Sequence, residues 1–232
     1  MEFLGGVVSD ALEALASFGS GLGEVLALTL VVSLIATILG VAVGVPLGIS
    51  LALGRYRGRR GLDLVVSVGM GIPPVLVGLF LLLLFWNEGP FGGLGLVFTP
   101  TAMVIAQFLL AVPIAAGVTA GAVRSLPASA LEQIDALKLG PWLKARVAVA
   151  EVGAGVAAAA AAAFGRVISE VGAVLIIGGN ILGETRVLTT LIVQESRQAR
   201  FGSAVAAGVV LLLLSLVVNV ALSRRGQRPV ST

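Results

Sequence analysis

The chain of 232 residues contains no cysteine and no histidine. Without cysteine it has no disulfide and no thiolate metal site. Without histidine it lacks the side chain that most often transfers protons or binds metals near neutral pH. We therefore expect no metal site in this protein.

Charged side chains are also scarce, at 12% of the residues, against about 25% in an ordinary soluble domain. Four stretches carry no charge at all: 25–54, 64–87, 89–123 and 201–223. A fifth apolar stretch, from Val152 to about Leu182, is interrupted only by Arg166 and Glu170. Because about 20 apolar residues cross a bilayer as a helix, the sequence predicts an all-α integral membrane protein with about five transmembrane helices.

Lysine and arginine are unevenly distributed among the connections between these spans. They cluster after the first, third and fifth spans: Arg55, Arg57, Arg59 and Arg60; Arg124, Lys138, Lys144 and Arg146; Arg224, Arg225 and Arg228. Cytoplasmic connections are enriched in basic residues, so we expect an external N-terminus and a cytoplasmic C-terminus in the cell (inner) membrane. The net charge of +3 then reflects helix ends, and we expect no nucleic-acid partner.

Residues 1–20 contain no basic residue and so lack the basic segment of a signal peptide. Their apolar residues share one helical face: Phe3, Leu4, Val7, Val8, Ala11, Leu12, Leu15 and Phe18. This pattern predicts an amphipathic helix at the membrane interface, the alternative being a poorly ordered terminus. We expect a single transmembrane domain over 21–224 and a cytoplasmic tail over 225–232.

Small residues and prolines recur within the predicted spans. Glycine recurs at four-residue spacing at Gly40, Gly44 and Gly48, and again at Gly117 and Gly121, which favours close helix packing in lipid. Prolines lie within the spans at Pro46, Pro73, Pro74 and Pro113. Each removes a backbone hydrogen bond, which indicates a lined cavity or a moving helix and argues against a membrane scaffold without transport.

The sequence has none of the motifs of a catalytic membrane protein. It lacks G-x-x-x-x-G-K-[ST], H-E-x-x-H and G-x-S-x-G. The chain therefore cannot cradle ATP or act as a hydrolase by these routes. We expect a non-catalytic membrane subunit that binds no cofactor itself.

The most informative polar stretch is 127–151, which predicts two short amphipathic helices separated by Gly140-Pro141. It resembles the segment of ABC importer permeases that couples to the ATPase, whose pattern is E-A-A-x-x-x-G. Ala136 and Gly140 match this pattern, and Glu132 lies two residues before its acidic position. The candidate coupling residues are Glu132, Asp135, Ala136, Lys138, Gly140 and Trp142. An ordinary amphipathic loop is the alternative.

Three further segments resemble the tungstate-type permeases of the molybdate/tungstate/sulfate ABC importer group: Gly71–Leu79, Gly89–Gln107 and Ser169–Ile192. The resemblance implies the type I permease fold and a homodimer. It also implies two cytoplasmic ATPase subunits, which bind ATP and Mg²⁺, and an extracytoplasmic oxyanion-binding protein. Tungstate is the expected ion, with molybdate and sulfate as alternatives. An ion-coupled carrier or channel without ATPase subunits is the alternative of another class.

Polar residues of the last segment suit a dianion. Neutral donors and one cation could bind it weakly enough to release it: Asn180, Thr185, Arg186, Thr189 and Thr190. A helix cap and turn is the alternative interpretation. Within the fourth span, the four-residue spacing of Arg166 and Glu170 predicts an intramembrane ion pair that holds the helix in place, or else a contribution to the gate.

Overall fold

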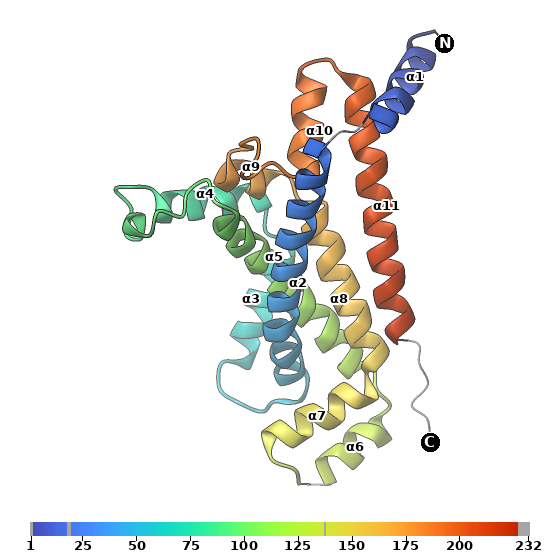
Figure 1. The fold of residues 1–232 in the computed structure, drawn as a ribbon. Coiled ribbons are helices and arrows are strands. Elements are labelled where there is room, and N and C mark those ends of the chain that lie inside the picture. Colours follow the sequence, from blue (N-terminus) through green and yellow to red (C-terminus); the bar gives the residue numbers. More distant parts are fainter. Residues whose placement is uncertain (1, 18–19, 137, 227–232) are drawn as a thin grey trace. The chain divides into compact units, whose positions relative to one another are not determined.

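The structure is a computed structural model that describes the backbone of residues 2–17, 20–136 and 138–226. Within these ranges, side chains at 2–3, 16–17, 20–21, 131, 134–135, 141–142 and 223–226 are not described. Every element in the described ranges is a helix (Figure 1). The helices are α1 (Glu2–Ser17), α2 (Ser20–Leu53), α3 (Arg59–Gly71), α4 (Pro74–Phe85), η1 (Gly92–Leu94), α5 (Pro100–Arg124), α6 (Ala128–Ala136), α7 (Pro141–Glu151), α8 (Gly153–Ile168), α9 (Gly172–Gly178), α10 (Leu188–Arg197) and α11 (Phe201–Gly226).

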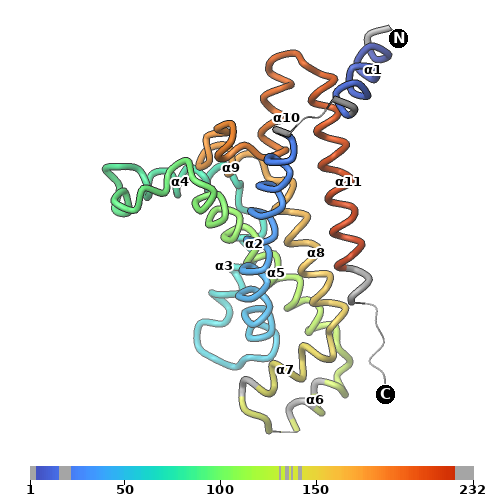
Figure 2. Tube along the Cα trace, viewed as in Figure 1, coloured from blue at the N-terminus to red at the C-terminus, as the bar shows by residue number. Residues whose placement is uncertain are grey.

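The chain divides into two compact units, whose backbone is traced in Figure 2. The first unit comprises Met1–Ala36, Pro73–Gln107 and Val167–Val217. The second comprises Thr37–Ile72, Phe108–Arg166 and Val218–Thr232. Four helices, α2, α5, α8 and α11, contribute residues to both units.

Three described helices are long and apolar enough to cross a membrane, and two broken helix pairs bring the number of candidate spans to five. The single helices are Leu22–Leu53, Pro100–Arg124 and Phe201–Leu222. The broken pairs are α3 with α4 and α7 with α8. The all-α architecture with about five spans is thus confirmed, but two spans are not simple helices.

Two of the four span prolines break a helix. Ile72, which precedes Pro73, is extended (φ −61°, ψ 131°), as expected for a residue whose helical conformation clashes with the following proline ring. Pro74 then begins α4, at a position where a missing N–H costs nothing. In contrast, α2 and α5 continue through Pro46 and Pro113.

The fourth span also differs from the prediction of one apolar helix over 152–182. Helix α8 ends at Ile168, and the Glu170 N–H donates to the carbonyl of Val167 in a tight turn. The short helix α9 follows, and residues 179–187 form turns. At its start, α8 is bent by 84° from α7.

Glycines bring α2 and α5 together in the second unit. Gly40, Gly44 and Gly48 face Ala111, Ala115 and Ala116 so closely that a Cβ at Gly44 would lie 2.7 Å from the carbonyl oxygen of Val112. The predicted close packing at this stripe is confirmed. Gly117 faces Met70, whereas Gly121 has open space around it.

The N-terminal segment folds as helix α1, as predicted. Leu4, Val8 and Leu12 are 57–67% exposed, so most of this apolar face is not covered by the chain. The side of α1 that carries Asp10 and the buried Ala11 contacts the first turn of α11, where Gly202 leaves room for the backbone. Such an uncovered apolar face suits a helix that lies at a membrane interface.

Candidate functional site

The connection between α9 and α10 is a tight, backbone-bonded turn in the first unit. Gly179 and Gly183 have positive φ angles (73° and 79°), and so does Asn180 (56°), a residue type that tolerates this region. The Thr185 hydroxyl donates to the Gly178 carbonyl (2.5 Å) and accepts from the Ile181 N–H (2.9 Å). Thr185 is fully buried and therefore holds both ends of the turn.

The other two candidate threonines also bind the backbone. Thr189 donates its hydroxyl hydrogen to the Glu170 carbonyl (2.9 Å), and Thr190 exchanges hydrogen bonds with the backbone of Val187. Both side chains are buried. This geometry agrees with the alternative of a helix cap and turn, while a role for the threonines as substrate donors stays a prediction.

Asn180 and Arg186 form a more accessible polar group. The Arg186 guanidinium donates to the side-chain oxygen of Asn180 (3.2 Å) and to its backbone carbonyl (3.4 Å). The Asn180 amide nitrogen in turn donates to Gln194 on α10 (2.7 Å). These two predicted site residues are therefore brought together, with Gln194 as a third member that the sequence analysis did not single out.

A small polar cavity of about 180 Å³ lies beside this group in the first unit. Its lining residues are Leu175, Asn180, Thr190, Val193, Gln194, Arg197 and Gln198. Thr190, Gln194 and Arg197 share one face of α10. This spacing of polar residues was a signal in the sequence that the sequence analysis did not use.

Arg186 also lines a second, smaller cavity of about 90 Å³ in the same unit. Glu24 and Glu184 line it as well, so this cavity has two carboxylates and one guanidinium among its lining residues. The cavity beside Arg197 has no carboxylate among its described lining residues. An anion therefore meets a more favourable field beside Arg197 than beside Arg186.

The turn between α10 and α11 is held by a clamp. The Arg200 guanidinium contacts both carboxylate oxygens of the buried Glu195, at 2.8 and 2.9 Å. The backbone N–H of Arg200 also donates to the backbone carbonyl of Glu195 (2.9 Å). The clamp fixes the end of α10, and with it Arg197 and Gln198.

The predicted ion pair between Arg166 and Glu170 assumed that both residues lie on one face of one helix, and the structure corrects this assumption. The two residues do not share a continuous helical face, because α8 ends between them at Ile168. The buried Glu170 carboxylate accepts a hydrogen bond from the Ala173 N–H (3.0 Å) and so caps the start of α9. An ion pair between Arg166 and Glu170 stays a prediction.

Gln107 on α5 is a buried polar residue that the sequence analysis did not single out. Its amide nitrogen donates to the Val167 carbonyl near the end of α8 (3.3 Å). Among the described residues its side-chain oxygen has no hydrogen-bond partner. An isolated glutamine in an apolar run gives no periodic signal in a sequence.

The candidate coupling segment in the second unit has the predicted form of two helices, α6 and α7, on either side of a break. Gly140 is the N-cap of α7, and Pro141 is its first residue. Glu132, Ala136, Lys138 and Gly140 are exposed, as docking requires. The side chains of Asp135 and Trp142 lie outside the described residues, and docking to an ATPase stays a prediction.

Comparison with known proteins identifies the family. Residues 44–228 match the model of the binding-protein-dependent transport system inner membrane component family. The chain belongs to this family.

Two curated relatives show which kinds of permease the chain is similar to. A probable anion ABC transporter permease protein of Haloferax volcanii is 41% identical over 169 residues, covering 71% of this chain and 73% of that one. The tungstate uptake system permease protein TupB of Peptoclostridium acidaminophilum is 36% identical over 220 residues, covering 94% and 96% of the two chains. The expected resemblance to tungstate-type permeases is thus confirmed.

Solved structures confirm the fold. A bacterial ABC transporter that imports the acidic polysaccharide alginate superposes with a TM-score of 0.71 at 16% identity, covering 96% of this chain and 84% of that one. At that identity the likeness concerns the fold alone. The chain has the fold of an ABC importer permease.

Proposed function

We propose that the chain is the permease subunit of an ABC importer for a tetrahedral oxyanion, with tungstate as the first candidate. The observation that carries the proposal is the 36% identity, over nearly the whole chain, to a protein named as a tungstate permease. The name of the relative from Haloferax volcanii, an anion permease, supports the same class of substrate. Molybdate and sulfate remain the alternatives, since they share the shape and the charge of tungstate.

The cavity beside Arg197 suits a transient oxyanion site. Amide groups of Asn180, Gln194 and Gln198 supply neutral polar contacts, and the one guanidinium supplies charge. A permeation site has to release its ion, so few charges and several neutral donors are preferable to a ring of arginines. We therefore propose that the ion binds beside Arg197 in addition to the Asn180–Thr190 segment.

The proposed assembly contains two copies of this chain, two cytoplasmic ATPase subunits and an external binding protein. ATP and Mg²⁺ are bound by the ATPase subunits, and motion reaches the spans through α6 and α7. The N-terminus lies outside and the C-terminus inside. The family match supports the external binding protein, because its members serve binding-protein-dependent systems.

Uptake into proteoliposomes tests the substrate. The permease, reconstituted with its ATPase and binding protein, should accumulate tungstate only when ATP is supplied, and competition with molybdate and sulfate should rank the ions. Uptake that proceeds equally without ATP would favour a channel or carrier. ATP-dependent uptake of sulfate alone would overturn the choice of tungstate.

The variant Arg197→Gln tests the polar cavity. A hydrogen bond to a charged group contributes about 1.5–3 kcal/mol, so we expect uptake to fall about tenfold or more. Ser196→Ala is the matched control, because the hydroxyl of this exposed neighbour donates to the Ile192 carbonyl on its own helix. Uptake by Arg197→Gln equal to that of the control would remove this cavity from the path.

The variant Arg186→Ala tests the candidate residue that the sequence singled out. Loss of its bonds to Asn180 should loosen the turn and lower uptake. Uptake at the wild-type level would count against Arg186 as part of the path.

A further inference from the structure

The C-terminal end of α2 in the second unit combines an apolar cavity with a dense basic cluster. The cavity, which we call the α2–α7 cavity, measures about 800 Å³. Its lining residues are Val45, Pro46, Ile49, Ser50, Leu53, Gly54, Tyr56, Leu139, Lys144, Ala145, Arg146 and Val149. None of these described lining residues is acidic.

The cavity extends along a membrane-spanning segment. Val45, Ile49 and Leu53 belong to the candidate span Leu22–Leu53. From Leu53 to Val45 the helix covers about 12 Å at 1.5 Å per residue. The cavity therefore runs from the end of this candidate span toward its middle, in the direction of the hydrocarbon region in which lipid chains lie.

A second hollow, of about 750 Å³, adjoins the first at Gly54 and Tyr56. Four arginines line it, namely Arg55, Arg57, Arg59 and Arg60. Its one carboxylate, Asp63, is paired with Arg124 at 2.8 Å. The hollow therefore carries a large excess of positive charge.

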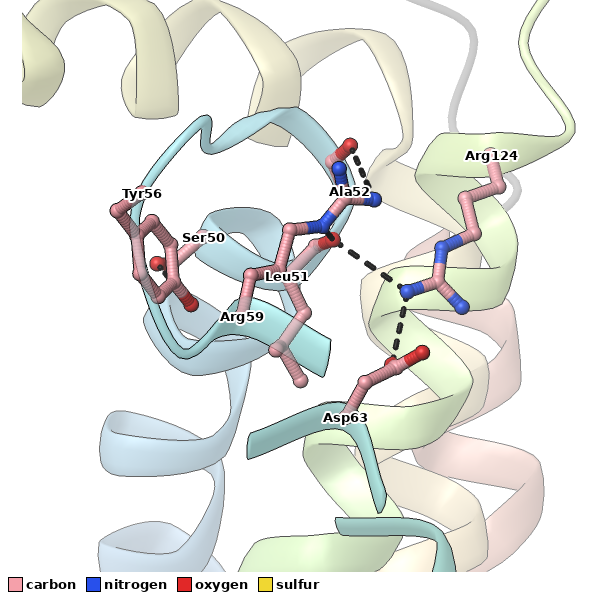
Figure 3. A network of polar contacts seen from close by, with 7 residues as sticks. All are labelled: Ser50, Leu51, Ala52, Tyr56, Arg59, Asp63 and Arg124. Carbon is pink, nitrogen blue, oxygen red and sulfur yellow. Dashed lines mark hydrogen bonds and ion pairs between the residues drawn. The ribbon is translucent and has the colours of Figure 1, made fainter. Parts of the chain in front are cut away.

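This hollow has a defined framework (Figure 3). The Arg59 side chain folds back and donates to the Leu51 carbonyl (2.8 Å), which also accepts from Arg124 (3.3 Å). The Tyr56 ring lies beside Ser50, whose hydroxyl donates to the Tyr56 oxygen (3.3 Å). Arg59 thus caps the end of α2. The residues Arg55, Arg57 and Arg60 are exposed to solvent.

From this arrangement we infer that the α2–α7 cavity and the arginine hollow together bind one anionic phospholipid. An acyl chain occupies the apolar cavity, and the phosphate headgroup lies against Arg55 and Arg57, with Lys144 and Arg146 at the other rim. Basic residues beside an apolar groove between membrane helices match the two parts of such a lipid. The alternative occupant, a soluble partner protein such as an ATPase subunit, would use the arginines but would leave the inner cavity empty.

The test uses the full-length permease, purified and delipidated in detergent, and titrated with phosphatidylglycerol in native mass spectrometry. We expect one tightly retained phosphatidylglycerol and no comparable retention of phosphatidylcholine. At about fivefold per basic residue, Arg55→Gln/Arg57→Gln should weaken the affinity about 25-fold. Lys138→Gln/Arg197→Gln, which removes the same charge outside the two hollows, should leave binding unchanged.

Filling the apolar part provides an independent variant. Val149→Trp should also abolish the tight binding, and its elution volume and melting temperature without lipid report whether it folds. Should Val149→Trp unfold, Leu53→Trp serves the same purpose from α2. Retention of phosphatidylglycerol in a folded variant of this kind would overturn the proposal, because the chain would then not occupy the cavity.

Two other results would also overturn it. Equal binding of glycerol 3-phosphate would identify a site for free phosphate compounds. If Arg55→Gln/Arg57→Gln retained lipid but lost co-purification with the ATPase subunit, the arginines would belong to a protein interface. Neither result depends on which oxyanion the importer carries.

Discussion

At the scale of single residues, hydroxyl groups hold the α9–α10 connection. Thr29 on α2 illustrates this, because its buried oxygen accepts a hydrogen bond from the Leu188 N–H at the start of α10 (3.0 Å). Its own hydrogen is donated to the Val25 carbonyl (2.6 Å). One side chain far away in the sequence therefore caps the helix that carries Gln194 and Arg197.

The variant Thr29→Val should lower the free energy of unfolding by about 1–3 kcal/mol, because it keeps the shape but leaves the buried Leu188 N–H without a partner. A thermal melt in detergent measures this. The same substitution at the exposed Thr101 is the control and should change the melting temperature little. Equal melting temperatures for the two variants would exclude the proposed cap.

At the scale of elements, backbone contact between α2 and α5 stabilises the second unit. Without a hydrophobic driving force between helices in lipid, close packing of small residues provides the attraction. The glycine stripe on α2 lies against backbone atoms of α5, and buried Leu51, Val66, Ala116 and Ala120 continue the contact toward α3. A side chain on this stripe would separate the two helices.

The variant Gly44→Ala should therefore destabilise the protein by about 1–3 kcal/mol, since its Cβ would collide with the Val112 carbonyl. Gly121→Ala on α5 is the control, and we expect it to change the free energy of unfolding in the opposite direction. It meets open space and should stabilise the helix by up to about 1 kcal/mol. Melting temperatures in detergent that shift in the same direction would contradict this packing.

The coupling elements α6 and α7 lend themselves to a test at the same scale. Scrambling residues 127–140, which lie outside the candidate spans, should leave the spans inserted but remove the ATP-dependent part of uptake, because the proposed contact with the ATPase subunits would be lost. Proteoliposome uptake with and without ATP measures this. Uptake as fast and as nucleotide-dependent as in the wild type would disprove the coupling role.

At the scale of the whole molecule, the distribution of basic residues sets the expected orientation. The arginine-rich connection after α2 and the α6–α7 segment should share the cytoplasmic side, and the connection between α4 and α5 should lie outside. The absence of cysteine makes this directly testable, since any thiol introduced is the only one in the chain.

Intact cells that express Gly93→Cys should react with a membrane-impermeant maleimide, whereas cells that express Lys138→Cys should react only after permeabilisation. Both positions are exposed, so accessibility within the protein does not limit the reaction. The wild-type chain, without cysteine, provides the background. The reverse labelling pattern would invert the proposed topology.

Much of the fold followed from patterns that are local in the sequence. Charge-free runs predicted the spans, glycine at four-residue spacing predicted close helix packing, and Gly140-Pro141 predicted the break between α6 and α7. Each depends on neighbours along the chain, which a sequence displays directly. The breaks at Ile72–Pro73 and after Ile168 were missed as helix ends, because each lies inside a stretch that is apolar enough overall to be taken as one span.

The candidate site depended on the folded chain to a much larger extent. The segment around Asn180 stood out in the sequence, but the cap from Thr29, the contact of Asn180 with Gln194 and the cavity beside Arg197 join residues from different helices. Whether a threonine hydroxyl is available to a ligand or already bound to backbone is likewise decided only by what packs against it. The amino-acid order determines which segments enter the membrane because transfer free energy is a property of each segment, whereas a polar cavity exists only once separate helices converge.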